Sequence, residues 1–187
     1  MKPLAAALFA FPALALAQGA VIIEVDDDTL LPGQSTTVTL SAQWTDYAMC
    51  CVFTDLVAST GDAGWSDLAL IAPMDGPGTS EGMLAPLGVD DIIAGQLNFP
   101  PGSFPPPPNP QPFWRATYTA PDDVIAPFDV DLTTETSLFE VYVERGTQET
   151  RDLLPGLVEG SATIRVIPAP ASVTVLALGL IANRRRR

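Results

Sequence analysis

Two adjacent cysteines, Cys50 and Cys51, are the only thiols of the sequence, which contains no histidine. Neighbouring residues of a strand point to opposite faces, so we expect the two thiols to diverge, and a disulfide between them would require a distorted backbone. Two small buried thiols are one interpretation, and a strained vicinal disulfide in an oxidising compartment is the other. Without a histidine or a third cysteine, we expect no zinc site.

Consecutive aspartates could bind a hard cation. Asp26, Asp27 and Asp28 form one run, and Asp90 and Asp91 form another. Carboxylate oxygens are the ligands that calcium prefers, so calcium is the one cofactor that the sequence suggests. No Asp-x-Asp-x-Asp-Gly loop is present, however, and adjacent aspartates in turns commonly cap the backbone or face water. A calcium-binding surface protein and a solvated acidic surface are therefore both open.

Carboxylates also define the only enzyme class that we consider, a carbohydrate-active enzyme that uses two of them. The lack of histidine excludes Ser-His-Asp and Cys-His catalysis, and no G-x-S-x-G motif occurs. Acidic residues are so numerous that no single pair stands out. We therefore predict no catalytic residue and favour a non-enzymatic protein.

The charge is distributed unevenly along the chain. Residues 18–167, which we take as the folded part, contain all 22 acidic residues of the protein but only four arginines, a net charge of −18. Such a surface repels phosphate backbones and attracts cations. We therefore expect no binding to nucleic acids.

The first 17 residues have the layout of a secretory signal. Lys2 precedes an apolar stretch over residues 4–14, and the small residues Ala15 and Ala17 stand at positions −3 and −1 of a cleavage site before Gln18. A buried core helix is the alternative, but Pro12 would interrupt it. We therefore expect an exported protein.

The C-terminus combines an apolar run with a basic end. Residues 173–182 are apolar, and Asn183 and four arginines follow: Arg184, Arg185, Arg186 and Arg187. Positive charges directly after an apolar run hold a membrane helix with its end in the cytoplasm. Residues 169–182 would span only about 21 Å as a helix, against about 30 Å of hydrocarbon, a gap that arginine snorkelling and bilayer thinning reduce. The alternative is a final strand of the fold with a basic tag.

The order of features at this end resembles the PEP-CTERM sorting tail of exported bacterial proteins. The motif residues precede the apolar run: Pro168, Ala169, Pro170, Ala171 and Ser172. Ala169 stands where the family has its namesake glutamate. The resemblance covers residues 168–187 and implies that an exosortase-like membrane protease processes the tail after transient anchoring in the membrane. It also implies a location in the cell envelope or outside the cell, with exopolysaccharide as a candidate ligand.

Residues 18–167 show the period-two alternation of strands. Hydrophobic Trp114, Ala116 and Tyr118 alternate with polar residues, and Val130 and Leu132 alternate with aspartates. Nine stretches have this character or are short apolar runs: 21–26, 36–42, 48–54, 67–72, 92–99, 113–119, 128–133, 137–144 and 161–167. Short strands with Pro and Gly between them, and no helical periodicity, predict an antiparallel β-sandwich.

Two local features add to this prediction. Residues 24–40 are similar to the first hairpin of bacterial immunoglobulin-like surface modules. Eight of the thirteen residues from Pro100 to Pro112 are proline, which predicts a stiff exposed loop. Such a loop could dock into an aromatic groove, or serve only as a rigid crossover, which we favour.

The domain organisation that follows is a signal peptide (1–17), a β-sandwich ectodomain (18–167) and a sorting tail (168–187) with a membrane helix. A sandwich at the cell surface or in the extracellular matrix needs no catalytic group. We therefore interpret the ectodomain as a non-catalytic structural or binding module.

Replacing all four C-terminal arginines with neutral residues should release the protein from the membrane or leave it unprocessed, because these charges anchor the apolar run. Cell fractionation measures the outcome. Deletion of residues 168–187 should leave a folded ectodomain with an unchanged melting temperature. A melting temperature lowered by several degrees, with normal localisation of the arginine variant, would instead show that the run is a core strand.

Overall fold

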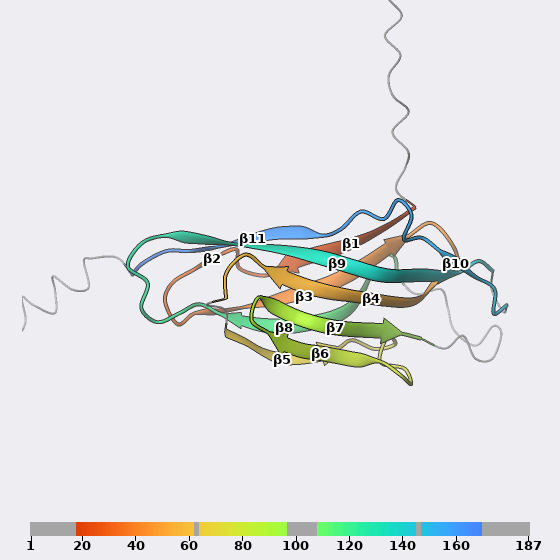
Figure 1. Cartoon of the computed structure of the whole chain (residues 1–187), viewed down its shortest axis with the longest axis horizontal. Coiled ribbons are helices and arrows are strands. Elements are labelled where there is room, and N and C mark those ends of the chain that lie inside the picture. Colours follow the sequence, from red (N-terminus) through yellow and green to blue (C-terminus); the bar gives the residue numbers. More distant parts are fainter. Residues whose placement is uncertain (1–17, 62–63, 97–107, 145–146, 170–187) are drawn as a thin grey trace, which may run out of the picture.

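The computed structural model describes residues 18–61, 64–96, 108–144 and 147–169, which form a two-layer β-sandwich (Figure 1). The smaller sheet has four strands in the order β1 (Gly19–Val25), β3 (Ser35–Trp44), β8 (Gln111–Thr119) and β5 (Gly64–Leu70). The larger has seven. Six follow the order β2 (Thr29–Leu30), β11 (Ser161–Val166), β9 (Phe128–Tyr142), β4 (Ala48–Ala58), β7 (Gly88–Gly95) and β6 (Ser80–Ala85), and β10 (Thr150–Asp152) pairs with β9. Within both sheets the strands pair antiparallel except β2 with β11.

The core lies between the two sheets and follows the predicted alternation. Trp114, Ala116 and Tyr118 of β8 are buried, and so are Val130 and Leu132 of β9. Large side chains from both layers fill the space between them, and the Trp114 indole N–H donates a hydrogen bond of 2.8 Å to the Glu81 carbonyl of the opposite sheet. The prediction of an all-β sandwich is confirmed, and the described residues contain no helix.

Three details differ from the expected strands. Residues 128–133 and 137–144 were expected as two strands but belong largely to one, β9, which pairs along much of its length with β4. β6 was not expected, because Ser80–Ala85 does not alternate clearly. Regular alternation along residues 137–144 would place Tyr142 on the outer face, yet it is 3% exposed, and its hydroxyl donates to the Gln96 carbonyl at 3.2 Å.

The expected signal peptide lies outside the described residues, as do the membrane helix and most of the tail. No helix long and apolar enough to cross a membrane occurs within residues 18–61, 64–96, 108–144 and 147–169.

Gly88 is required by a close approach between β7 and β4. Its φ is +136°, and an added Cβ would lie 1.9 Å from the Leu56 carbonyl oxygen. Gly78 also has a positive φ, +84°, but a Cβ there would meet nothing within 4 Å. Alanine substitutions at the two positions therefore distinguish two free-energy costs. Both include the positive φ, but only the substitution at Gly88 adds a steric clash.

Gly88→Ala should lower the free energy of unfolding by at least about 2 kcal/mol more than Gly78→Ala, because only Gly88 adds overpacking to an unfavourable φ. Urea titrations of both variants measure the difference. Equal destabilisation would contradict the close strand approach at Gly88.

Candidate functional site

A β-bulge places both cysteines on the outer side of the larger sheet. Met49 pairs with Val141 and Cys51 pairs with Glu140, so Cys50 is an extra residue on β4. Met49 and Val52, on either side of the pair, are fully buried, whereas both cysteines are half-buried. The expectation that the thiols diverge is therefore wrong, because it assumed regular pleating and a bulge locally reorients the side chains of its strand.

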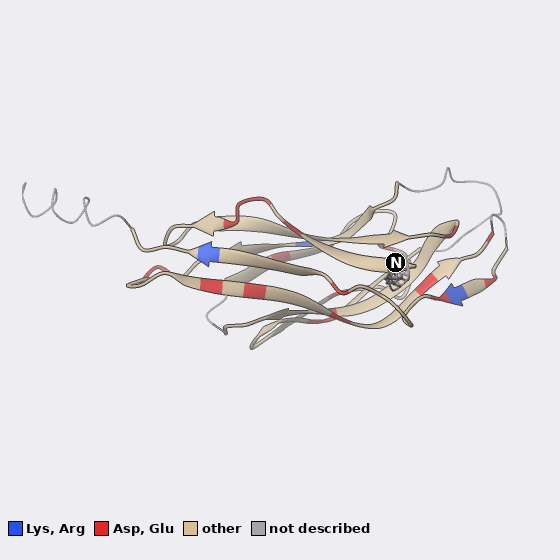
Figure 2. Cartoon of the chain, turned by 90° about the horizontal axis from the view of Figure 1, so that it is seen from above, with Lys and Arg blue, Asp and Glu red and all other residues tan. Residues whose placement is uncertain are grey.

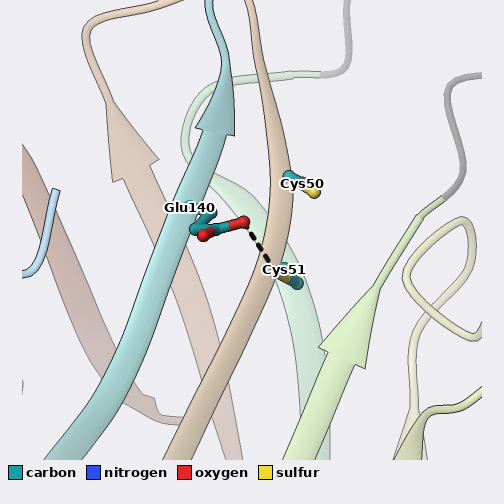
Figure 3. Close-up of side chains that lie close together, drawn as sticks. All are labelled: Cys50, Cys51 and Glu140. Atoms are coloured by element: carbon teal, nitrogen blue, oxygen red, sulfur yellow. Dashed lines mark hydrogen bonds between the residues drawn. The ribbon is translucent and has the colours of Figure 1, made fainter. Parts of the chain in front are cut away.

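Glu140 of β9 completes a cluster with the two thiols (Figure 3). The two sulfur atoms and a carboxylate oxygen of Glu140 all lie within 4.8 Å of one another. The Cys51 thiol donates a long hydrogen bond of 3.9 Å to Oε2 of Glu140. No disulfide joins the two cysteines.

Gln96 fixes the backbone beside this cluster. Its N–H donates to the Cys50 carbonyl at 3.0 Å, and its side-chain Nε2 donates to the Met49 carbonyl at 2.6 Å. The Gln96 carbonyl in turn accepts the hydrogen bond from the Tyr142 hydroxyl. Gln96 therefore donates two hydrogen bonds to the backbone of the bulge and is itself held by Tyr142.

The two thiols have different acidities. The pKa of Cys50 is lowered to about 7, chiefly because Cys51 donates a hydrogen bond to its thiolate, with a second contribution from Tyr142, while burial and the charge of Glu140 act in the opposite direction. The pKa of Cys51 is raised well above its usual range, chiefly by its hydrogen bond to Cys50 and also by burial. Cys50 is therefore the more acidic thiol of the pair.

The candidate calcium ligands occupy two separate places. Asp26, Asp27 and Asp28 form the exposed turn between β1 and β2. Asp90 and Asp91 lie on β7, and in the larger sheet three strands separate β7 from β2. The two runs therefore belong to different parts of the sandwich.

Each run makes backbone contacts of its own. The Asp27 N–H donates to the Thr36 hydroxyl at 2.8 Å, and Asp91, with a φ of +57°, donates its N–H to a carboxylate oxygen of Asp55 at 2.8 Å. Within the described ranges, only one group of three Cys, Asp or Glu side chains has ligand atoms close enough together to bind a metal ion. It consists of Cys50, Cys51 and Glu140. Figure 2 shows the acidic residues spread along several strands and turns.

The predicted processing residues fall mainly at the ends of the described chain. Gln18 is the first described residue, and its carbonyl accepts a hydrogen bond from the Thr45 hydroxyl. Pro168 and Ala169 follow β11. The other predicted cleavage and sorting residues lie outside the described residues: Ala15, Ala17, Pro170, Ala171, Ser172, Arg184, Arg185, Arg186 and Arg187.

Glu140 and Gln96 are partners of the cysteines that the sequence does not predict. The position of Glu140 opposite Cys51 depends on the pairing of β4 with β9, which the sequence does not show locally. The run Met49–Phe53 is uniformly apolar or sulfur-containing, so it gives no local signal of a bulge.

Comparison with known proteins identifies the fold. No protein-family model matches the chain, and no curated protein matches its sequence. Among solved structures, the seventh ScaB type I cohesin from Pseudobacteroides cellulosolvens superposes with a TM-score of 0.59 at 13% identity, covering 81% of this chain and 92% of that one. The chain has a cohesin-like fold.

Two complexes from Clostridium thermocellum show the same likeness. The Coh-OlpA-Doc918 complex, a type I cohesin–dockerin complex, matches with a TM-score of 0.52 at 15% identity, over 80% of this chain and 99% of that one. The Coh-OlpC-Doc435 complex matches with a TM-score of 0.53 at 9% identity, over 81% and 94%. At these identities the likeness concerns the fold alone.

Alkylation of Cys50 by iodoacetamide should rise with pH through a midpoint near 7, because the thiolate is the reacting species. Cys51→Ala should move this midpoint upward and slow the reaction at pH 7, since it removes the hydrogen bond that stabilises the Cys50 thiolate. Mass spectrometry of the alkylated chain measures both rates. A midpoint that does not move in the variant would contradict the assigned role of Cys51.

Proposed function

We propose that this chain is an exported, non-catalytic binding module that docks a protein partner on the outer face of its larger sheet. The observation that carries the proposal is a set of exposed hydrophobic side chains on that sheet. Four of the six large hydrophobic residues that are exposed in the described part of the chain belong to β4, β6 and the turn between β6 and β7.

The first part of this surface is the outer apolar row, which consists of Leu138, Phe53 and Ile93. Phe53 pairs with Leu138 of β9 on one side and with Ile93 of β7 on the other. The residues on either side of Phe53 are buried, so its side chain points outward, where it is 37% exposed. An exposed aromatic residue on an interior strand is the kind of group that dominates the energy of a protein interface.

The second part is the β6–β7 hairpin at the edge of the same sheet. Met83, Leu84 and Leu87 are 62%, 63% and 50% exposed. Clustered hydrophobic residues on a surface mark interaction sites more often than single ones do. Met83 pairs with the exposed Asp90 and so extends the outer apolar row across β9, β4, β7 and β6, whereas Leu84 pairs with the buried Val89 and lies on the other side of this edge strand.

The charges around this surface define the partner. Asp55 and Glu140 are half-buried beside the outer apolar row, and Asp90 and Asp91 are exposed on β7. We therefore expect a partner that offers an apolar centre with a basic rim. Because the similar solved structures include cohesin–dockerin complexes, a dockerin-like module is the partner that we propose.

A carbohydrate-active enzyme is the alternative function. A hollow of about 480 Å³ has one acidic lining residue, Asp123; the others are Pro121, Val124, Ile125, Ala126 and Phe128. A glycosidase of the usual kind needs two carboxyl groups across its substrate. This hollow therefore does not support hydrolysis, and turnover of a polysaccharide panel by the purified chain would favour the enzyme instead.

Export and sorting are part of the proposal and rest on the sequence motifs. The signal of residues 1–17 would direct the chain across the inner membrane, and the tail of residues 168–187 would serve an exosortase-like protease. The final location would be the cell envelope or the extracellular matrix. Binding to exopolysaccharide is the other non-catalytic role compatible with this destination.

Phe53→Asp should weaken the binding of a dockerin-type module by at least about tenfold, because it places a charge at the centre of the apolar surface. Calorimetric titration of the full chain with dockerin modules of the encoding organism measures the effect. Ile125→Asp is the matched control, since Ile125 is 97% exposed but lies in the loop between β8 and β9. Its affinity should stay within about twofold of that of the unmodified chain.

Two outcomes would contradict the docking proposal. Equal losses of affinity for the dockerin module in Phe53→Asp and Ile125→Asp would show that binding does not involve the outer apolar row. Retention of the chain on purified exopolysaccharide, with no affinity for any dockerin module, would assign the ectodomain to carbohydrate binding.

A further inference from the structure

We propose that Cys50, Cys51 and Glu140 form a binding site for a thiophilic divalent ion, Zn²⁺, with a fourth position open to solvent. The site does not depend on the docking of a protein partner. It also reverses the expectation from the sequence, because two sulfur ligands and one oxygen ligand converge where regular pleating would have separated them.

The geometry of the three ligand atoms suits such an ion. Zinc binds thiolate sulfur at about 2.3 Å and carboxylate oxygen at about 2.0–2.2 Å, so the ligand atoms of a tetrahedral site lie roughly 3.5–4 Å apart. Here all three lie within 4.8 Å of one another, and the Cys51 sulfur is 3.9 Å from Oε2 of Glu140. Small side-chain rotations are therefore enough to close the site.

The scaffold holds the ligands on two adjacent interior strands. Cys50 and Cys51 belong to β4, and Glu140 belongs to β9. Two hydrogen bonds from Gln96 fix the bulge of β4 at Cys50. Ligands on strands are positioned more accurately than ligands on loops. The preformed backbone reduces the ordering that an ion would otherwise impose.

The surroundings provide room for an ion. Gly95 is the residue of β7 that pairs with Cys51, and an added Cβ would lie only 3.4 Å from the Cys51 Cβ. A glycine there leaves the outer side of Cys51 uncovered. A three-ligand protein set is typical of zinc sites that keep a fourth position for water or another ligand.

The donor set and the charge favour zinc over the common hard cations. Calcium and magnesium select oxygen ligands, whereas thiolates select zinc and other soft ions. The net charge of −18 over residues 18–167 raises the local concentration of cations. Each thiol that is still protonated releases its proton to solvent when it binds the ion.

The test is a titration of the full chain, reduced and freed of metal, with Cd²⁺ as a spectroscopic substitute for Zn²⁺. Binding to thiolates produces a charge-transfer absorption band, and the chain has two cysteines and no histidine, so the band reports this site. We expect one Cd²⁺ per chain in the presence of excess Ca²⁺, and displacement by Zn²⁺. Absence of the band, or loss of binding in Ca²⁺, would overturn the proposal.

Three variants and a matched control assign the ligands. Cys50→Ser and Cys51→Ser should each lower the affinity at least about 100-fold, and Glu140→Gln about tenfold with the band retained. Glu135→Gln, an exposed position on the same strand, should behave as the unmodified chain. Far-UV circular dichroism checks that each variant is folded. Equal affinities of folded Glu140→Gln and Glu135→Gln, or full affinity in either serine variant, would contradict the site.

Discussion

The pairing of β4 with β9 is the interaction on which the rest of the sandwich depends. It joins Ala48–Ala58 to residues 132–142 and contains two irregularities. Cys50 is an extra residue on β4, and Ser137 is an extra residue on β9. The two shifts cancel, so the strands are in the same register at both ends of the pairing, and the residues that face the core at each end remain buried.

The shifted segment between the two bulges carries the candidate functional groups. It contains Cys51 and Phe53, which face outward, and Val52, which remains in the core. A bulge interrupts the regular hydrogen bonding of a ladder. In this protein Gln96 supplies hydrogen bonds to the backbone carbonyls of Met49 and Cys50. The same local distortion therefore supports both the thiol cluster and the outer apolar row.

A bulge in the other sheet has a comparable effect on the core. Leu40 pairs with Trp114 and Ser41 with Pro112, so Phe113 is an extra residue on β8. Phe113 and Trp114 are consequently both buried, although regular alternation would expose one of them. Two large aromatic side chains fill the core from adjacent positions, and the Trp114 N–H reaches across to the Glu81 carbonyl of the larger sheet.

The sequence predicts the layers of this fold better than it predicts the candidate site. Alternation in β3, β8 and β9 follows from one face being buried, so it identifies the strands and most of their inward residues. Bulges depend on which strand lies opposite, and this information is not local. The adjacent aromatic residues Phe113 and Trp114 are a visible break in the alternation, whereas the apolar run around Cys50 and Cys51 has no such break. The convergence of the thiols with Glu140 could therefore not be derived from spacing.

The likeness to cohesin modules establishes an architecture, and the functions proposed for this chain rest on its own side chains. The zinc proposal requires that β4 presents Cys50 and Cys51 on the outer face of the larger sheet, the same face on which the docking proposal places Phe53. Anomalous diffraction at the zinc absorption edge, from crystals of the reduced chain grown with Zn²⁺, tests this requirement most directly. We predict one peak beside β4, about 2.3 Å from both sulfur atoms and next to Glu140. Thiols on opposite faces of the sheet, or a peak bound only by surface carboxylates, would contradict it.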